Sequence, residues 1–164
     1  MIDEIDRELI LELQKDGRQS YIDLAKTLKV SETTVRNRVK QLIGDGMINI
    51  TAIPNLEAMG YGFMGIVGLQ VRLADLRTIA SQIAKHPNVC YLANVTGRFD
   101  FILIVLTRTS GEFAEFMENA ISAIPNILRT ETFVNLHIYK GQVIGLDTGH
   151  LISKLDISSL KKQV

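Results

Sequence analysis

The sequence predicts an α+β chain of two small domains, a helical one followed by a mixed one. In the first fifty residues, apolar side chains recur at helical spacing behind capping residues. Beyond residue 62, runs rich in Ile, Val and Leu alternate with two helical stretches, which is typical of a sheet with helices packed on it. Hydrophobic residues make up 46% of the 164 residues, more than two small domains need for their own cores. The excess indicates burial against further copies of the chain.

Composition argues against several classes of protein. No apolar run reaches the ~18 residues that span a bilayer, and the acidic start at Asp3 and Glu4 is unlike a basic secretory leader. Cys90 is the single cysteine, which excludes an intramolecular disulfide framework. His86, His137 and His150 lack metal-ligand spacing, and no catalytic motif stands out. We therefore expect a cytoplasmic protein that has no membrane partner, is not an enzyme and holds no metal.

Three short helices are predicted in the N-terminal third. Asp3, Ser20 and Ser31 are suited to cap them, because their side chains can accept hydrogen bonds from the first turn of a helix. The first helix ends near residue 16, the second covers 21–29 and the third runs from 32 to about 44. Their inward-facing stripes are predicted to be Ile5, Leu9, Ile10 and Leu13; then Ile22, Ala25 and Leu28; then Val35, Val39 and Leu42.

The charge distribution singles out the third helix. Residues 1–16 hold two basic and six acidic side chains, whereas residues 17–44 hold six basic and two acidic ones, although the whole chain is neutral. The outward face of the third helix combines amide, hydroxyl and cationic groups, which contact base edges and phosphates. Two short helices joined by a tight break, the second with such a face, predict a helix-turn-helix that binds double-stranded DNA. The expected DNA contacts are Ser31, Thr33, Thr34, Arg36, Asn37, Arg38, Lys40 and Gln41.

Two features of this region have alternative interpretations. Three short helices also make a plain bundle whose third face is merely solvated. The segment 47–53 alternates apolar and polar residues before Pro54, which predicts a short strand. Such a strand would serve as the wing of a winged helix-turn-helix or as a connector.

The second domain follows a linker predicted at 51–62, where Pro and Gly punctuate the chain. Strands are predicted at 63–73, 89–95, 99–106 and 127–139. Helices are predicted at 76–84 and after Ser110, where Phe113, Phe116 and Met117 begin an apolar stripe. The order β-α-β-β-α-β is ferredoxin-like. The predicted domains are therefore 1–50, the linker 51–62, 63–140 and an unassigned C-terminal extension 141–164, in which Leu155, Ile157 and Leu160 are apolar.

From Asp3 to Lys140 the chain resembles the Lrp/AsnC family, the leucine-responsive or feast/famine regulators. In the first domain the matching residues are Ile5-Asp6, Asp16-Gly17-Arg18, Leu24-Ala25, and Ser31…Thr34-Val35…Arg38-Val39…Leu42…Gly46…Ile48. In the second domain, Thr96-Gly97-Arg98-Phe99-Asp100 is similar to the family's Gly-x-x-Asp turn, and Arg129-Thr130-Glu131-Thr132 resembles its threonine-bearing final strand. Each fragment is weakly specific, but their order and spacing together are strongly so.

The resemblance implies a transcription regulator with a ligand-sensing and oligomerisation domain. Family members form homodimers through their C-terminal sheets, often stacked into tetramers or octamers, and hold an amino-acid effector between dimers. By position, Thr96, Gly97, Arg98, Phe99 and Asp100 would line that cleft, with Thr130 and Thr132 contributed by a neighbouring subunit. Gly97 would expose amides to a carboxylate and Asp100 would pair an ammonium. The family often has Tyr where this chain has Phe99, so a hydroxyl contact is missing.

Other interpretations of the effector segment and of the whole chain stay open. Residues 97–100 also make an ordinary hairpin turn. Tetrapyrrole decarboxylases that resemble the family keep its shape but do chemistry in the second domain. Such an enzyme would need cofactor-facing histidines and would lose the basic helix, whereas here Arg36, Arg38 and Lys40 are present and the sequence has no histidine cluster. A third possibility is an assembly partner of related regulators that does not itself bind DNA.

Overall fold

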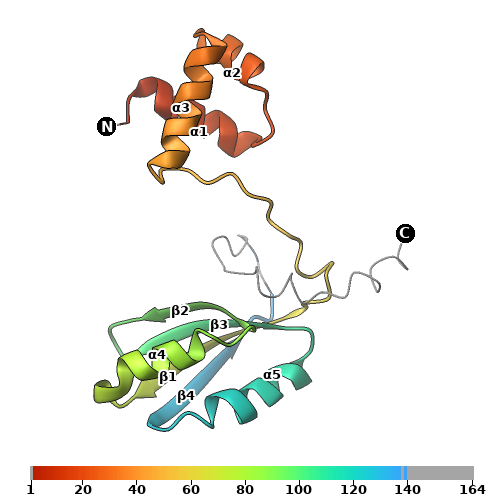
Figure 1. The fold of residues 1–164 in the computed structure, drawn as a ribbon. Helices are drawn as coiled ribbons and strands as arrows, with labels where there is room; N and C mark the ends of the chain where they lie inside the picture. Colours follow the sequence, from red (N-terminus) through yellow and green to blue (C-terminus); the bar gives the residue numbers. More distant parts are fainter. Residues whose placement is uncertain (1, 138, 140–164) are drawn as a thin grey trace. The chain divides into compact units, whose positions relative to one another are not determined.

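The computed structural model describes residues 2–137 and 139, and divides the chain between Ala52 and Ile53 into two compact units (Figure 1). The division falls within the segment 51–62 that was expected to be a linker. The extension predicted at 141–164, with Leu155, Ile157 and Leu160, lies outside the described residues.

The N-terminal unit contains three helices, α1 (Glu4–Lys15), α2 (Tyr21–Leu28) and α3 (Glu32–Gly44). The three predicted caps are confirmed: Asp3, Ser20 and Ser31 accept hydrogen bonds from the third residue of the helix that each precedes. Each bond satisfies an amide that the helix itself leaves without a partner. The core of the unit consists of Leu9, Leu24, Ala25, Val35, Val39 and Leu42.

Two predictions for this unit are wrong. Ile22 was expected to face inward but is 54% exposed, because it lies about 160° around α2 from the buried Leu24. Residues 47–53 form no strand, so the short strand predicted there, as a wing or a connector, is absent. The amides of Met47 and Ile48 instead donate to the Leu42 carbonyl, and with Gly46 at a φ of +69° these bonds close the C-terminus of α3. A strand also needs a hydrogen-bonded partner, and none of the described strands pairs with this segment.

The C-terminal unit is the predicted ferredoxin-like fold. It contains β1 (Phe63–Val71), α4 (Leu76–Ile83), β2 (Val89–Asn94), β3 (Phe101–Thr107), α5 (Ser110–Phe116) and β4 (Ile127–Val134). A short 3₁₀ turn (Leu73–Asp75) precedes α4, and a π-helical turn (Met117–Ile121) follows α5. The sheet order is β2-β3-β1-β4, and each pair of neighbouring strands is antiparallel.

Three differences from the predicted boundaries stand out in this unit, besides the ends of β1, α4 and β2, which lie one or two residues earlier than predicted. The cap of α5 is Thr109, whose hydroxyl accepts from the Glu112 amide, so the predicted cap Ser110 is instead the first helical residue. The last strand ends at Val134 rather than near residue 139, because its neighbour β1 begins at Phe63 and offers little further backbone to pair with. The strand predicted at 99–106 begins at Phe101, since Phe99 and Asp100 belong to the preceding turn.

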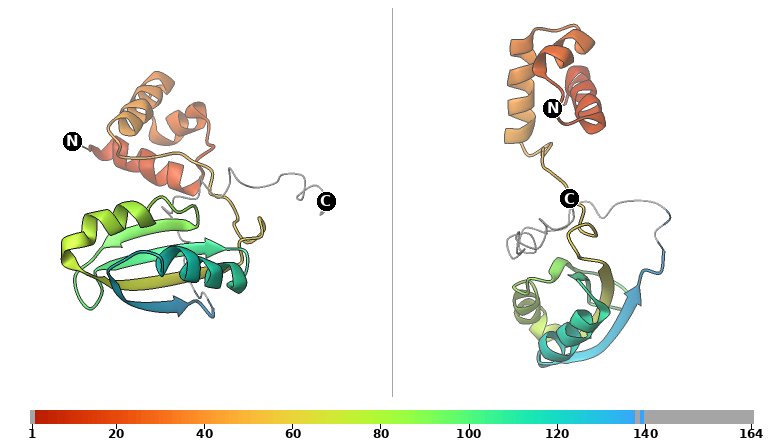
Figure 2. Two further views of the ribbon diagram at one scale, coloured as in Figure 1. Left: turned by 60° about the horizontal axis from the view of Figure 1, so that its bottom comes forward. Right: turned by 90° about the vertical axis from the view of Figure 1, so that its right-hand side faces the viewer.

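The two faces of the sheet have different surroundings. Figure 2 shows α4 and α5 against the same face, where Val67, Leu69, Leu103 and Val105 form the core with residues of both helices. Strand register places the alternate residues on the opposite face, which we call the open face. Its open residues are Ile66, Gly68, Gln70, Tyr91, Ala93, Ile102, Ile104, Arg129, Glu131 and Phe133. At one end of the same face, Met64 and Leu106 are covered by Leu56, Met59 and Tyr61.

Gly65 of β1 is a position where the helix-covered face permits no side chain. A Cβ built there would overlap the ring of Phe113 on α5, with the ring Cζ only 2.7 Å away. We expect Gly65→Ala to lower the free energy of unfolding by about 1–3 kcal/mol through overpacking, measured by urea denaturation. The control is Gly62→Ala, where the nearest atom lies 4.0 Å from the added Cβ. Equal stability of the two variants would contradict the packing of Phe113 on β1.

Candidate functional site

The exposed side of α3 gathers five of the residues predicted to contact DNA. Thr33, Arg36, Asn37, Lys40 and Gln41 are all exposed and lie on the side of α3 away from Val35, Val39 and Leu42. We call these five residues the α3 outer face. They offer two cations, two amides and a hydroxyl, with no carboxylate among them. This set of groups can contact both phosphates and base edges.

Ser31 and Thr34 have a structural task at the start of α3. The Ser31 Oγ accepts from the Thr34 amide at 3.0 Å, and the two hydroxyls lie 2.7 Å apart. Both residues therefore fix the first turn of the helix. Their place at its N-terminus also puts them where free amides attract anions.

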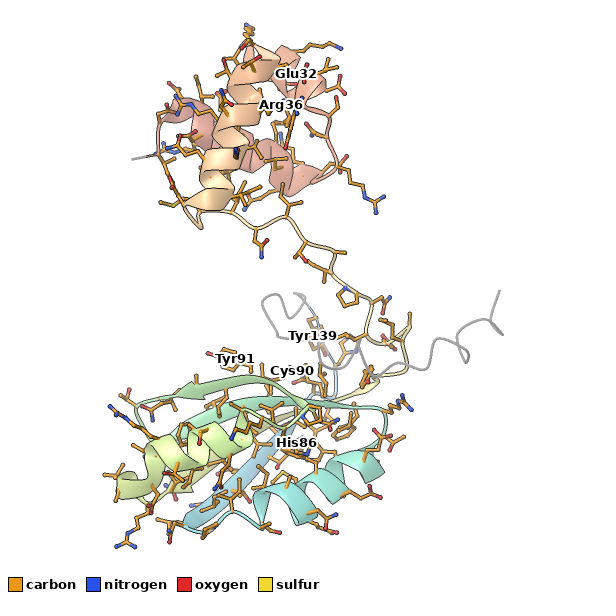
Figure 3. The ribbon with its side chains drawn as sticks, in the orientation of Figure 1. Glu32, Arg36, His86, Cys90, Tyr91 and Tyr139 are labelled. Atoms are coloured by element: carbon orange, nitrogen blue, oxygen red, sulfur yellow. The ribbon has the colours of Figure 1, made fainter. Side chains whose placement is uncertain are left out.

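Arg36 is held at the outer face by two neighbours, of which only Glu32, four residues earlier on the helix, could be expected from the sequence. Its Nη2 lies 2.6 Å from Glu32 Oε1, one turn earlier on α3 (Figure 3). Its guanidinium also lies 5.2 Å from the ring centroid of Tyr21 on α2. A guanidinium stacked on an aromatic ring keeps its hydrogen-bonding edge available, so Arg36 is oriented before any contact with DNA.

Arg38 lies elsewhere, although it was predicted as a DNA contact with the others. Its Nη1 contacts Asp3 Oδ2 at 2.6 Å and Asp6 Oδ2 at 3.1 Å, both at the start of α1. The hydrogen bond that Arg38 donates to the Asp3 carboxylate is the largest cause that raises the pKa of Arg38 above its ordinary value. The structure thus places Arg38 in an ion-pair cluster and not on the α3 outer face.

The pKa of Asp3 makes this cluster sensitive to acid. The hydrogen bond from the Asp6 amide, and after it Arg38, lower the pKa of Asp3 below its ordinary value of 3.8. A carboxyl whose pKa is lowered by folding stabilises the fold above its unfolded pKa, and this stability is lost as the pH falls through the folded pKa. We expect the thermal stability of the N-terminal unit to fall below about pH 4, with a shallower fall in Asp3→Asn. Identical pH profiles for the two proteins would contradict this role of Asp3.

The turn between β2 and β3 contains the predicted effector residues 96–100. Gly97 adopts a φ of +118°, a conformation that other residues rarely take. The Asp100 amide donates to the Leu69 carbonyl, and Asp100 Oδ2 accepts from the Val71 amide, each at 2.8 Å. Asp100 therefore ties the turn to the end of β1, so one of its oxygens is already engaged.

Phe99 and Arg98 cover one end of the open face. The Phe99 ring lies directly on Gly68, where an added Cβ would come within 2.7 Å of the ring. The Arg98 guanidinium stacks on Phe99 at 4.8 Å and pairs with Glu131 at 2.5 Å. Glu131 was not predicted as a site residue. Its position between Thr130 and Thr132 was the available signal: successive residues of a strand face opposite sides of a sheet, so Glu131 had to lie on the face that the two threonines do not share.

Thr130 and Thr132 lie on the other side of the sheet from Phe99. They pair with Leu69 and Val67, which face the helices, whereas Glu131 pairs with Gly68 of the open face. Within a single chain, Thr130 and Thr132 therefore do not lie beside the 96–100 turn. Thr130 instead borders a hollow of about 570 Å³ between the π-helical turn and β4. Its apolar lining residues are Met117, Ile121, Ile124, Ile127 and Leu128.

Within residues 2–137 and 139, no cluster of three or more His, Cys, Asp or Glu side chains is arranged to hold a metal ion. Among the same residues, no helix has the length and apolarity required to cross a membrane.

Two family models match the chain in the order of its two units. Residues 2–43 match the AsnC-type helix-turn-helix domain, and residues 64–143 match the Lrp/AsnC ligand binding domain. The transcriptional regulator FL11 of Pyrococcus abyssi is 32% identical over 140 residues, covering 85% of this chain and 92% of FL11. The chain belongs to the Lrp/AsnC family.

Solved structures of Lrp/AsnC proteins have the same fold. E. coli AsnC superposes with a TM-score of 0.82 at 25% identity, covering 88% of this chain and 98% of AsnC. A Neisseria meningitidis regulator in complex with L-Met superposes with a TM-score of 0.80 at 22% identity, covering 87% of this chain and 95% of the Neisseria chain. As a member of the Lrp/AsnC family, the chain is a DNA-binding transcription regulator and not an enzyme, as the sequence predicted.

Proposed function

We propose that this regulator binds DNA through the α3 outer face, as a homodimer, and responds to an amino acid bound at the 96–100 turn. The observation that carries the DNA contact is the grouping of Thr33, Arg36, Asn37, Lys40 and Gln41 on one exposed side of α3, at whose edge Glu32 pairs with Arg36. Lys40 and Arg36 supply the charge that attracts phosphates, and the amides of Asn37 and Gln41 are suited to adenine. A dimer would place two such helices on half-sites about 34–36 Å apart.

The open face supports the proposed dimer. It presents Ile66, Ile102 and Ile104 together with Tyr91 and Phe133, which are 46% and 43% exposed. A sheet with one such face uncovered is stabilised when a second copy buries it, and a two-fold axis needs only one self-complementary surface. This also accounts for the apolar excess of the sequence.

The amino-acid effector rests on the chemistry of the turn and of β4. Gly97 exposes backbone amides suited to a carboxylate, and Asp100 still has acceptor capacity for an ammonium beyond its bond to Val71. The hollow beside Thr130 offers apolar residues that would contact the side chain of the amino acid. Within one chain this hollow and the 96–100 turn lie on opposite faces of the sheet, so a neighbouring subunit would have to supply the hollow. The Neisseria relative in complex with L-Met supports an amino acid as the ligand class.

Fluorescence anisotropy tests the DNA contact. The probes are the DNA upstream of the protein's own gene and a duplex of random sequence, titrated over a series of salt concentrations. We expect tight, salt-sensitive binding to the upstream DNA that is lost in Arg36→Ala/Lys40→Ala. A lack of binding at low salt would refute the proposal, and binding equal to that of random DNA would call for a duplex selected by the protein itself.

A thermal-shift screen of the twenty amino acids tests the effector. At least one is expected to raise the melting temperature, since a ligand that binds only the folded state stabilises it. Thr130→Val removes one hydroxyl with little change of shape and is expected to weaken that shift. If no amino acid shifts the melting temperature, the effector is not an amino acid.

A further inference from the structure

The two arginines of α3 at positions 36 and 38 point to different helices of the N-terminal unit. They lie about 160° apart around the helix axis, on either side of the buried stripe of Val35 and Val39. Arg36 stacks on Tyr21 of α2 and remains at the outer face. Arg38 reaches the first turn of α1 and has only 32% of its side chain exposed. The two residues therefore have different surroundings, although the sequence suggests one role for both.

The contacts of Arg38 are shared with the cap of α1. Asp3 and Asp6 form a reciprocal capping box: the Asp6 amide donates to Asp3 Oδ1 at 2.9 Å, and the Asp3 amide donates to Asp6 Oδ2 at 3.2 Å. Arg38 Nη1 lies 2.6 Å from Asp3 Oδ2 and within 3.2 Å of both Asp6 oxygens. One guanidinium thus links α3 to both residues that begin α1.

Burial and charge oppose a phosphate contact by Arg38. The Asp6 side chain is only 8% exposed, so a move of Arg38 to DNA would leave a nearly buried carboxylate without its cation. Two carboxylates against one guanidinium also leave the cluster with net negative charge, which repels phosphate. Neither argument applies to Lys40, an exposed residue for which the structure gives no ion pair.

We propose that Arg38 is a positioning residue of the recognition helix and does not itself contact DNA. By anchoring α3 to the first turn of α1, it fixes the angle at which the α3 outer face is presented. The proposal concerns a residue outside that face, so it can fail while the outer face still binds DNA.

The test measures DNA binding of Arg38→Met, Asp6→Asn and Lys40→Ala to a duplex selected by the wild-type protein and to random DNA. Lys40→Ala is expected to reduce the salt slope of log K by about 1, as for a lost phosphate contact. Arg38→Met is expected to keep the wild-type slope while the preference for the selected duplex falls about tenfold, the value of one base contact. A slope reduced by about 1 in Arg38→Met would overturn the proposal.

Asp6→Asn decides the matter even if Arg38→Met does not fold, because it keeps the arginine and removes a partner. A positioning role predicts a lower preference for the selected duplex. A contacting role predicts that Arg38, then held by Asp3 alone, binds DNA more tightly with an undiminished preference, and that result would overturn the proposal. Glu8→Gln, an exposed change of equal charge on α1, serves as control. Titration of the active fraction at high DNA concentration separates these effects from simple loss of folded protein.

Discussion

Ile104→Glu is expected to convert the proposed dimer into monomers. Ile104 lies in the middle of the open face, where it pairs with Ile66 on β1 and with Tyr91 on β2. A carboxylate at the centre of a buried apolar interface would lose its hydration without gaining a cationic partner. We expect the dimer affinity to fall by at least about thirtyfold, which is the usual loss at a central interface residue. Sedimentation velocity or light scattering across a concentration series measures this change.

A matched control for this variant lies on the helix-covered side of the same unit. Ser81→Glu adds the same charge at an exposed position of α4 and is expected to leave the assembly unchanged. A dimer binds two DNA half-sites more tightly than two separate monomers do, because binding of the first half-site brings the second helix close to its own. Ile104→Glu should therefore also weaken DNA binding. If Ile104→Glu assembles like the wild type, the open face is not the interface and the apolar excess needs another explanation.

Local patterns in the sequence predicted most of the N-terminal unit. The caps Asp3, Ser20 and Ser31 lie next to the helices that they begin, so a short window contains both partners of each bond. The partners of Arg38, Asp6 and Asp3, lie 32 and 35 residues away in sequence, so no local pattern could distinguish Arg38 from Arg36. The strand predicted at 47–53 is absent for a related reason. These residues have the alternation of a strand, but a strand depends on a hydrogen-bonded partner that local sequence cannot supply.

In the C-terminal unit, too, local patterns could be predicted from the sequence, whereas contacts between residues distant in sequence could not. Strand alternation could have placed Glu131 on the face opposite to Thr130 and Thr132, because their spacing alone determines it. The packing of the Phe99 ring on Gly68 could not be predicted in this way, since it depends on how the turn before β3 folds back over β1. Likewise, the bond from Val71 to Asp100 joins residues 29 apart and changes how much of that carboxylate is left for a ligand.

Leu9→Ala is expected to unfold much of the N-terminal unit under conditions where the C-terminal unit stays folded. Leu9 is fully buried between the three helices, and each unit has its own core cluster. Truncating a buried leucine costs about 2–5 kcal/mol, and small domains have total stabilities of about 5–15 kcal/mol. A unit of residues 1–52 has a small core and little stability to spare. DNA binding should therefore be lost together with helical circular dichroism, whereas the assembly state is retained.

Leu11→Ala on the same helix is the control for this variant, because Leu11 is 52% exposed and the chemical change is identical. It should alter stability by less than about 1 kcal/mol, as is usual for surface positions. If both leucine variants lose DNA binding equally, burial of Leu9 is not the cause. If Leu9→Ala also dissociates the assembly, the two units do not unfold independently, and α1 contributes to assembly as well as to the core of its own unit.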